Sequence, residues 1–279
     1  MEAIKELLEH ETAGDPMSGL KWTRKTTQKI ADELKPLGII VGRTTVGKLL
    51  KKMKYSLKVN QKNIGAGKDS DRNEQFEYIG SQRKQAAAQG IPVISVDTKK
   101  KEKVGQFKNS GATWRQEAQQ VNDHDFRSMA IGMAAPYGIY DVKANRGFVC
   151  VGTSYDTPEF AVECVVKWWR DEGVKRYPDA PEVLILADGG GSNGARCRLW
   201  KSALQEKLCD RFGLSVTVAH YPPGASKWNP IEHRLFSEVS KNWAGEPLDS
   251  YETILKFVRA TRTKTGLKVR SRLVSKQYK

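Results

Sequence analysis

The chain has little that would fit it for an oxidising compartment or a membrane. Its 279 residues include only four cysteines, and no stretch approaches the roughly 18 consecutive apolar residues of a membrane span. The N-terminus also lacks the apolar core of a signal peptide. Disulfides and a zinc site are not expected, because no two cysteines lie close together and none has a ligand-like histidine spacing. We expect a cytoplasmic protein with reduced, buried thiols at Cys150, Cys164, Cys197 and Cys209.

Acidic residues are also few relative to basic ones. The chain has 47 lysines and arginines against 32 aspartates and glutamates, which gives a formal charge of +15. Such an excess favours a polyanionic partner, and nucleic acid is favoured over a membrane because no apolar anchor is present. A chain of this length can bury a sizeable core and form more than one domain.

Residues 20–58 form a basic unit with the pattern of a helix-turn-helix. A first helical pattern ends at Pro36 and Gly38, and a second helix is expected to begin at Thr44 or Thr45 as its cap. In such a motif the second helix lies in the major groove of DNA. An ordinary amphipathic hairpin with a solvated charged face has the same pattern. The predicted DNA contacts are Arg43, Thr44, Thr45, Lys48, Lys51 and Lys52.

Composition divides the chain into three parts. Residues 59–75 are polar and contain glycines, as in a linker, and a helix is expected to follow. We therefore predict a helix-turn-helix DNA-binding region over 1–58, a linker with a connecting helix over 59–90, and an α/β domain over 91–279. The basic tail from residue 256 is expected to contact DNA phosphates or to form a charged face.

Short apolar runs and helical patterns alternate in the third part. The expected elements are a strand at 93–97, a hairpin of strands at 137–142 and 147–153, a helix from 157, a strand at 183–187, a helix at 195–212 and a strand at 214–220. A mixed sheet flanked by helices is the economical packing of that order.

Three acidic residues lie where this fold would present them. Asp97 and Asp188 each end a buried apolar run, and Glu232 begins a helical pattern. A charge at such a position is costly unless a cation or hydrogen bonds offset it. Mg²⁺ takes oxygen ligands from a few carboxylates, which fits this set. Taken singly, each aspartate is equally consistent with an acid that lies in a loop or caps a helix. Glu232 is equally consistent with the glutamate of a capping box in which Asn229 is the N-cap.

The glycine-rich segment after Asp188, GGGSNG, contains the pattern G-x-G-x-x-G. Dinucleotide binding is disfavoured because Asp188 would repel a pyrophosphate and the following strand ends in His220 and Tyr221 instead of an acid. A P-loop is excluded because no Lys-Ser or Lys-Thr follows the glycines. The glycines fit a backbone that a DNA strand approaches closely.

Three blocks resemble the signature blocks of the Rhodopirellula-type DDE transposases of bacterial insertion sequences. They are ISVDTKKKE at 94–102, ADGGGSNG at 187–194 and SKWNPIEHRLF at 226–236, and the resemblance spans nearly the whole chain. The segment YPPG at 221–224 is also similar to a block of the mariner-like transposases. The resemblance implies a ribonuclease-H-like catalytic core in the third part. The metal-binding catalytic triad that it implies is Asp97, Asp188 and Glu232.

The same resemblance implies two-metal cleavage and strand transfer of an insertion sequence. The expected cofactor is Mg²⁺, with Mn²⁺ as a substitute; Asp97 would contact both ions, and Asp188 and Glu232 one each. The expected partner is double-stranded DNA, both transposon terminal inverted repeats and target DNA, bound by a nucleoid-associated homodimer. Family members continue beyond 265–270, so a truncated C-terminus is one expectation. Further predicted DNA contacts are Lys99, Asn193 and Lys227.

Two other functions remain open from the sequence. A non-catalytic DNA-binding protein, either a regulator or a decayed transposase fragment, would use the acids only to cap structure. A hydrolytic nuclease with the same core would cut DNA strands without joining them. Metal dependence distinguishes the first alternative from a transposase, and strand joining distinguishes the second.

Overall fold

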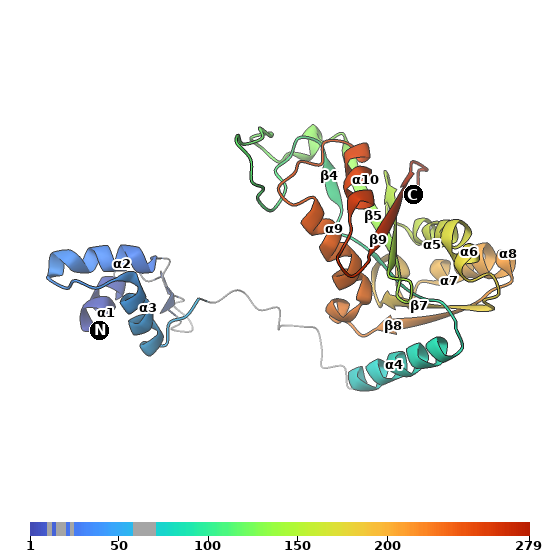
Figure 1. Ribbon diagram of the computed structural model, residues 1–279, viewed down its shortest axis with the longest axis horizontal. Coiled ribbons are helices and arrows are strands. Elements are labelled where there is room, and N and C mark those ends of the chain that lie inside the picture. Colours follow the sequence, from blue (N-terminus) through green and yellow to red (C-terminus); the bar gives the residue numbers. More distant parts are fainter. Residues whose placement is uncertain (10–12, 15–20, 23–24, 58–70) are drawn as a thin grey trace. The chain divides into compact units, whose positions relative to one another are not determined.

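The computed structural model of the chain divides into two compact units, Met1–Gly65 and Ala66–Lys279 (Figure 1). Most of the predicted linker, 59–75, lies outside the described residues. In the described ranges, no helix is both long and apolar enough to cross a bilayer. The residues that the structure describes are 1–9, 13–14, 21–22, 25–57 and 71–279.

The described residues of the first unit include three α-helices that pack around a small apolar core. Thr26 caps the second helix by accepting a hydrogen bond from the Lys29 N–H at 3.1 Å, and Gly38, with a φ of 76°, follows the 3₁₀ turn η1 (Lys35–Leu37). The elements are α1 Glu2–Glu9, β1 Ala13–Gly14, β2 Lys21–Trp22, α2 Thr27–Leu34 and α3 Arg43–Lys52. The core residues are Ile4, Ile30, Ala31, Leu34 and Val46.

The helix α3 begins slightly earlier than predicted. Gly42, in an extended conformation, takes the N-cap position, so Thr44 and Thr45 lie in the first turn and do not cap it. Val46 of α3 packs into the core, so the opposite side of this helix faces the solvent. The predicted DNA contacts of this helix are therefore exposed, namely Arg43, Thr44, Thr45, Lys48, Lys51 and Lys52.

A seven-stranded mixed sheet forms the centre of the second unit. Its strands follow the order β8-β7-β3-β5-β6-β9, and β4 pairs with β5. The strands β3, β7 and β8 are parallel, whereas β5 is antiparallel to β3 and β6. The strands are β3 Val93–Thr98, β4 Glu102–Val104, β5 Gly132–Asp141, β6 Arg146–Gly152, β7 Glu182–Asp188, β8 Ser215–Tyr221 and β9 Lys268–Val274.

Helices cover both faces of this sheet. Figure 1 shows α5 to α8 on one side and α9 with α10 on the other, and α4 packs against β7 and β8. Both faces are thereby removed from water, as a sheet with buried parallel strands requires. The helices are α4 Arg72–Ala88, α5 Pro158–Trp168, α6 Val174–Arg176, α7 Arg198–Leu204, α8 Asp210–Phe212, α9 Ser237–Asn242 and α10 Tyr251–Ala260.

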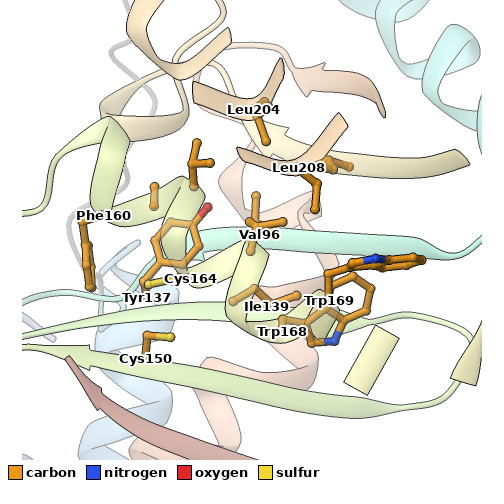
Figure 2. Packing of buried hydrophobic residues seen from close by; sticks show 14 of the residues in the cluster. Val96, Tyr137, Ile139, Cys150, Phe160, Cys164, Trp168, Trp169, Leu204 and Leu208 are labelled. Atoms are coloured by element: carbon orange, nitrogen blue, oxygen red, sulfur yellow. The ribbon is translucent and has the colours of Figure 1, made fainter. Parts of the chain in front are cut away.

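Large side chains fill the space between α5 and the sheet, as Figure 2 shows. Phe160 and Trp168 of α5 pack in one cluster with Tyr137 of β5, and each is almost fully buried. Burying each such side chain stabilises the fold by about 1.5–3 kcal/mol. All four cysteines are free; Cys150 and Cys164 are buried here as predicted, whereas the other two are only half-buried.

Two strands differ from the sequence prediction. The strand β5 begins at Gly132 and not at Tyr137, although it contains Pro136, which cannot donate a ladder hydrogen bond. The Pro136 carbonyl instead accepts a hydrogen bond from the Lys99 N–H at 2.9 Å. The basic tail contributes the second half of α10 and the unpredicted strand β9, in which Arg270 and Arg272 are exposed and Val269, Ser271 and Val274 are buried. Its contacts with DNA stay a prediction.

Candidate active site

Two of the three predicted acids lie side by side where β3 and β7 end. These neighbouring strands are parallel, and their register pairs Val96 with Ala187. The next residues along the two strands are Asp97 and Asp188. Because paired strands lie about 4.8 Å apart, the two carboxylates leave the sheet next to each other.

Both aspartates face the side of the sheet opposite α5. Ile94 and Val96 of β3 pack into the cluster beneath α5, and side chains alternate along a strand, so Ser95 and Asp97 face the other way. The strand β7 has the same alternation and presents Asp188 on that side too. Strand alternation and parallel register together bring the two acids to one edge.

Glu232 reaches this edge from the segment that follows β8. It begins a π-helical turn, η7 (Glu232–Phe236), which continues into α9, and π turns are frequent at functional sites. The turn lies close to the sheet because β5 has Gly138 opposite Asp97. A Cβ atom at Gly138 would lie 2.6 Å from the Phe236 ring. No local sequence pattern marks this glycine, because its role depends on a contact between distant segments.

Neighbouring carboxylates shift the pKa values of Asp97 and Glu232. Burial and the nearby charges of Asp188 and Glu232 raise the pKa of Asp97 to about 7, although the Thr98 N–H donates to its Oδ1 at 2.7 Å. Burial is also the main reason that the pKa values of Asp188 and Glu232 are raised. The side chains of Asp97 and Glu232 share a hydrogen bond. The edge therefore brings three carboxylates with raised pKa values together.

The chemistry of these donors suits a hard divalent cation. They offer only oxygen atoms, from three separate segments, which is the ligand type that Mg²⁺ prefers. Within the part of the chain that the structure describes, no group of three acidic, histidine or cysteine side chains is arranged to hold a metal ion. Like charges repel without a cation between them. A cation would offset the repulsion from Asp188 and Glu232 that, after burial, raises the pKa of Asp97.

Asn229 does not form the capping box that was one explanation of Glu232. Its side chain is buried, and its Nδ2 donates a hydrogen bond to Oδ1 of Asp188 at 3.2 Å. Its Oδ1 accepts a hydrogen bond from the Ser95 hydroxyl. The Glu232 side chain turns to Asp97, and η7 has no side-chain cap. The capping alternative is therefore wrong for both residues.

A cavity of about 630 Å³ opens in front of the ends of β3 and β7. Lys100 and Lys101 line it together with the glycine-rich loop 189–193. It also contains Asp156, which accepts a hydrogen bond from the Thr98 hydroxyl at 3.2 Å. This fourth carboxylate was not predicted from the sequence, although it follows shortly after a predicted strand.

The remaining predicted DNA contacts differ in accessibility. Lys99 is largely buried and forms an ion pair with Glu102 at 2.7 Å. Asn193 is only 2% exposed, and its Oδ1 accepts a hydrogen bond from the Tyr137 hydroxyl at 2.8 Å. Lys227 is exposed. Lys227 is therefore the most accessible of the three. A role of all three in DNA binding stays a prediction.

Comparisons with known proteins agree with this architecture. A family model described as the Rhodopirellula transposase DDE domain matches residues 3–279. No curated protein matches the chain. A solved Mos1 transposase paired-end complex with left transposon end has 16% identity, covering 92% of this chain and 69% of that chain, with a TM-score of 0.52. The Mos1 mariner paired-end complexes with Mn and Mg have 16% and 15% identity, each covering 91% and 68%, and TM-scores of 0.51. The likeness shows the predicted ribonuclease-H-like fold.

Proposed function

Since the chain belongs to the Rhodopirellula-type DDE transposase family, we propose that Asp97, Asp188 and Glu232 bind the divalent metal ions with which this transposase cleaves DNA. The observation that carries the proposal is that carboxylates from three segments meet at one edge, where Asp188 and Glu232 help to raise the pKa of Asp97 and Asp188 helps to raise that of Glu232. Purely structural acids are normally paired with basic side chains, whereas Asp97 lies beside the negative charges of Asp188 and Glu232. The Mos1 complexes with Mn and Mg support the use of such ions.

The proposed reaction has two phosphoryl transfers. Water attacks a phosphodiester at the transposon end and frees a 3′-hydroxyl; this hydroxyl then attacks a target phosphodiester and displaces its 3′ oxygen. Bound Mg²⁺, or Mn²⁺ in its place, would activate the attacking oxygen and stabilise the leaving oxygen. Asp97 interacts with both other acids, which suits it to be a ligand shared by two ions. No protein nucleophile is required.

The cavity supplies features that suit a DNA strand. Lys100 and Lys101 are exposed on its wall and would attract phosphates. A Cβ atom at Gly190 or Gly191 would meet no other atom within 4 Å, so the space beside this loop is open. Gly191 also has a φ of 68°, which favours glycine. We propose that the cleaved strand passes along this loop.

Two transposon ends must be handled together for an element to move. A homodimer with one active edge for each end would meet this requirement, as closed symmetric pairs are the commonest oligomers. The Mos1 relative was solved as a paired-end complex, which supports such an assembly here. We propose that the dimer forms on the DNA.

Cleavage and joining are expected to require Mg²⁺ or Mn²⁺. The assay uses wild-type protein and a duplex that carries the element's end, with each ion titrated after chelation, and calorimetry reports ion binding. Joined products that appear with the ion and vanish with chelator are the expected result. DNA binding without ion binding or cleavage would favour the non-catalytic alternative, whereas cleavage without joining would favour the hydrolytic nuclease.

Arg43→Ala should weaken binding of the transposon end more than binding of unrelated DNA. Arg43 is exposed at the start of α3, where the second helix of a helix-turn-helix contacts bases. A lost base contact costs about 1–3 kcal/mol, or roughly 5- to 150-fold in affinity. Fluorescence anisotropy with specific and scrambled duplexes measures both losses. Lys35→Ala, which removes a charge elsewhere in the same unit, is the matched control, and equal losses on both duplexes would contradict base recognition.

A further inference from the structure

Two buried polar residues lie behind the three carboxylates. Ser95 of β3 and Asn229, which precedes η7, are both 0% exposed. A buried polar group is costly unless its hydrogen bonds are satisfied. Both side chains are satisfied, and their partners belong to the segments that carry the acids.

The hydrogen bonds between these segments form a continuous chain. The Ile231 N–H donates to Oγ of Ser95 at 3.1 Å, and the Ser95 hydroxyl donates to Oδ1 of Asn229. The Nδ2 of Asn229 then donates to Oδ1 of Asp188 at 3.2 Å. Hydrogen bonds in such a buried chain polarise and strengthen one another. Loss of the serine hydroxyl would leave a donor and an acceptor unpaired.

All three acid-bearing segments are joined by this chain of bonds. Ser95 precedes Asp97 by two residues on the same face of β3. Asn229 contacts Asp188 directly, and its carbonyl accepts a hydrogen bond from the Glu232 N–H at 3.1 Å. We propose that Ser95 and Asn229 are positioning residues that set the relative placement of the three carboxylates for metal binding. This inference rests on the metal-binding role of the triad proposed above.

Packing alone does not require a serine and an asparagine at this place. Replacing both partners of a buried hydrogen bond by apolar groups of the same shape is often nearly neutral for stability. The pair adds orientation, because the Asn229 amide engages Oδ1 of Asp188 and leaves Oδ2 for a metal ion. Groups that orient metal ligands in this way typically change metal affinity or activity 10- to 100-fold when they are replaced.

The substitutions Ser95→Thr and Ser95→Val test the role of the hydroxyl. The two new side chains have nearly the same shape, and only threonine retains the hydroxyl. For Ser95→Val we expect a Kd for Mn²⁺, measured by calorimetry without DNA, that is about 10- to 100-fold higher than for Ser95→Thr. The Mn²⁺ concentration for half-maximal cleavage should rise by a similar factor, with a smaller loss at saturating Mn²⁺.

Ser271→Ala is the matched control for loss of a buried serine hydroxyl. Ser271 lies in β9, away from the acids, and its hydroxyl donates to the Leu255 carbonyl at 3.3 Å. This variant should lower the melting temperature while leaving the Kd for Mn²⁺ unchanged. A Ser95→Val protein that melts lower but binds Mn²⁺ as tightly as Ser95→Thr would overturn the positioning role. Wild-type protein that binds no Mn²⁺ would instead overturn the proposed metal site.

Asn229→Ala provides a second test. Unlike the substitutions of Ser95, it adds no methyl group to the buried strand β3. It should raise the Kd for Mn²⁺ at least as much as Ser95→Val, because it removes the direct contact with Asp188. If both residues act through one chain of bonds, the double variant should lose little more affinity than Asn229→Ala alone. If the double variant instead raises the Kd by the product of the two single-variant factors, the two residues act independently. That result would contradict a single positioning chain.

Discussion

Alanine at Asp97, Asp188 or Glu232 is expected to lower DNA cleavage by at least about 10³-fold, because each variant removes a ligand from ions that contribute several kcal/mol to the transition state. Binding of the transposon end should stay nearly unchanged, since the exposed basic face of α3 belongs to the other compact unit. Gel-based cleavage assays and anisotropy on the same end duplex measure the two properties.

Glu238→Ala is the matched control, because it removes a carboxylate that follows η7 in the sequence and leaves the three acids intact. Glu238 lies in α9, just after η7, and pairs with Lys241 at 2.6 Å. It should cleave as the wild type does. If any of the three triad variants retained cleavage at the control's rate, that residue would not be a metal ligand in the reaction.

Asp97→Asn should make the metal-free protein more stable at neutral pH. Between about pH 4 and 7 the unfolded chain has ionised Asp97, with a usual pKa near 3.9, while the folded protein keeps the proton because the pKa is raised to about 7. The wild type therefore loses stability as the pH rises through this window, and the asparagine variant avoids that loss. The difference should reach roughly 2–4 kcal/mol at pH 8 relative to pH 4.

Urea unfolding in the presence of chelator at pH 4 and pH 8 measures this effect. Asp123→Asn, at a side chain that is 84% exposed, should show no such pH-dependent gain. Added Mg²⁺ should reduce the advantage of Asp97→Asn, since an ion that binds only the folded wild type stabilises it. An equal gain at both pH values would mean that the raised pKa of Asp97 is not the cause.

The candidate site was predictable as far as it depends on local sequence. Asp97 and Asp188 each follow a run of apolar residues, and this pattern alone indicates acids at strand ends. The resemblance to a family then selected Glu232, whose local pattern also fitted a helix cap. The parallel register that makes the two aspartates neighbours connects distant segments and has no local signal.

The supporting residues could not be found in this way. Ser95 and Asn229 form a hydrogen bond across 134 positions of sequence, and neither has an unusual neighbourhood in the chain. Asp156 follows β6 after several polar residues and resembles an ordinary loop acid. Gly138 lies inside a strand, where glycine weakens the strand unless another segment must come close. Their roles follow from tertiary contacts.

The strand boundaries show the same limit. The predicted strand left out the first part of β5, up to Pro136, although the Pro136 carbonyl still pairs with the Lys99 N–H. In β9, arginines alternate with Val269 and Ser271, so a strand was hidden in what looked like a charged tail. Ion pairs of Arg270 with Glu172 and of Arg272 with Asp171 tie that strand to the fold. Tertiary pairing overrode the local pattern in both cases.

The pairing of β9 with β6 also sets an order for folding during synthesis, because β6 must wait for the later segment β9 before its outer edge is paired. Seven residue pairs join these strands, from Arg146 with Lys268 to Gly152 with Val274. While a ribosome is still translating the segment between them, β6 has an open edge that other nascent chains could pair with. All three acids are synthesised before that edge closes. A nascent transposase therefore carries all three acids of the proposed triad before it has the strand β9 that covers this edge.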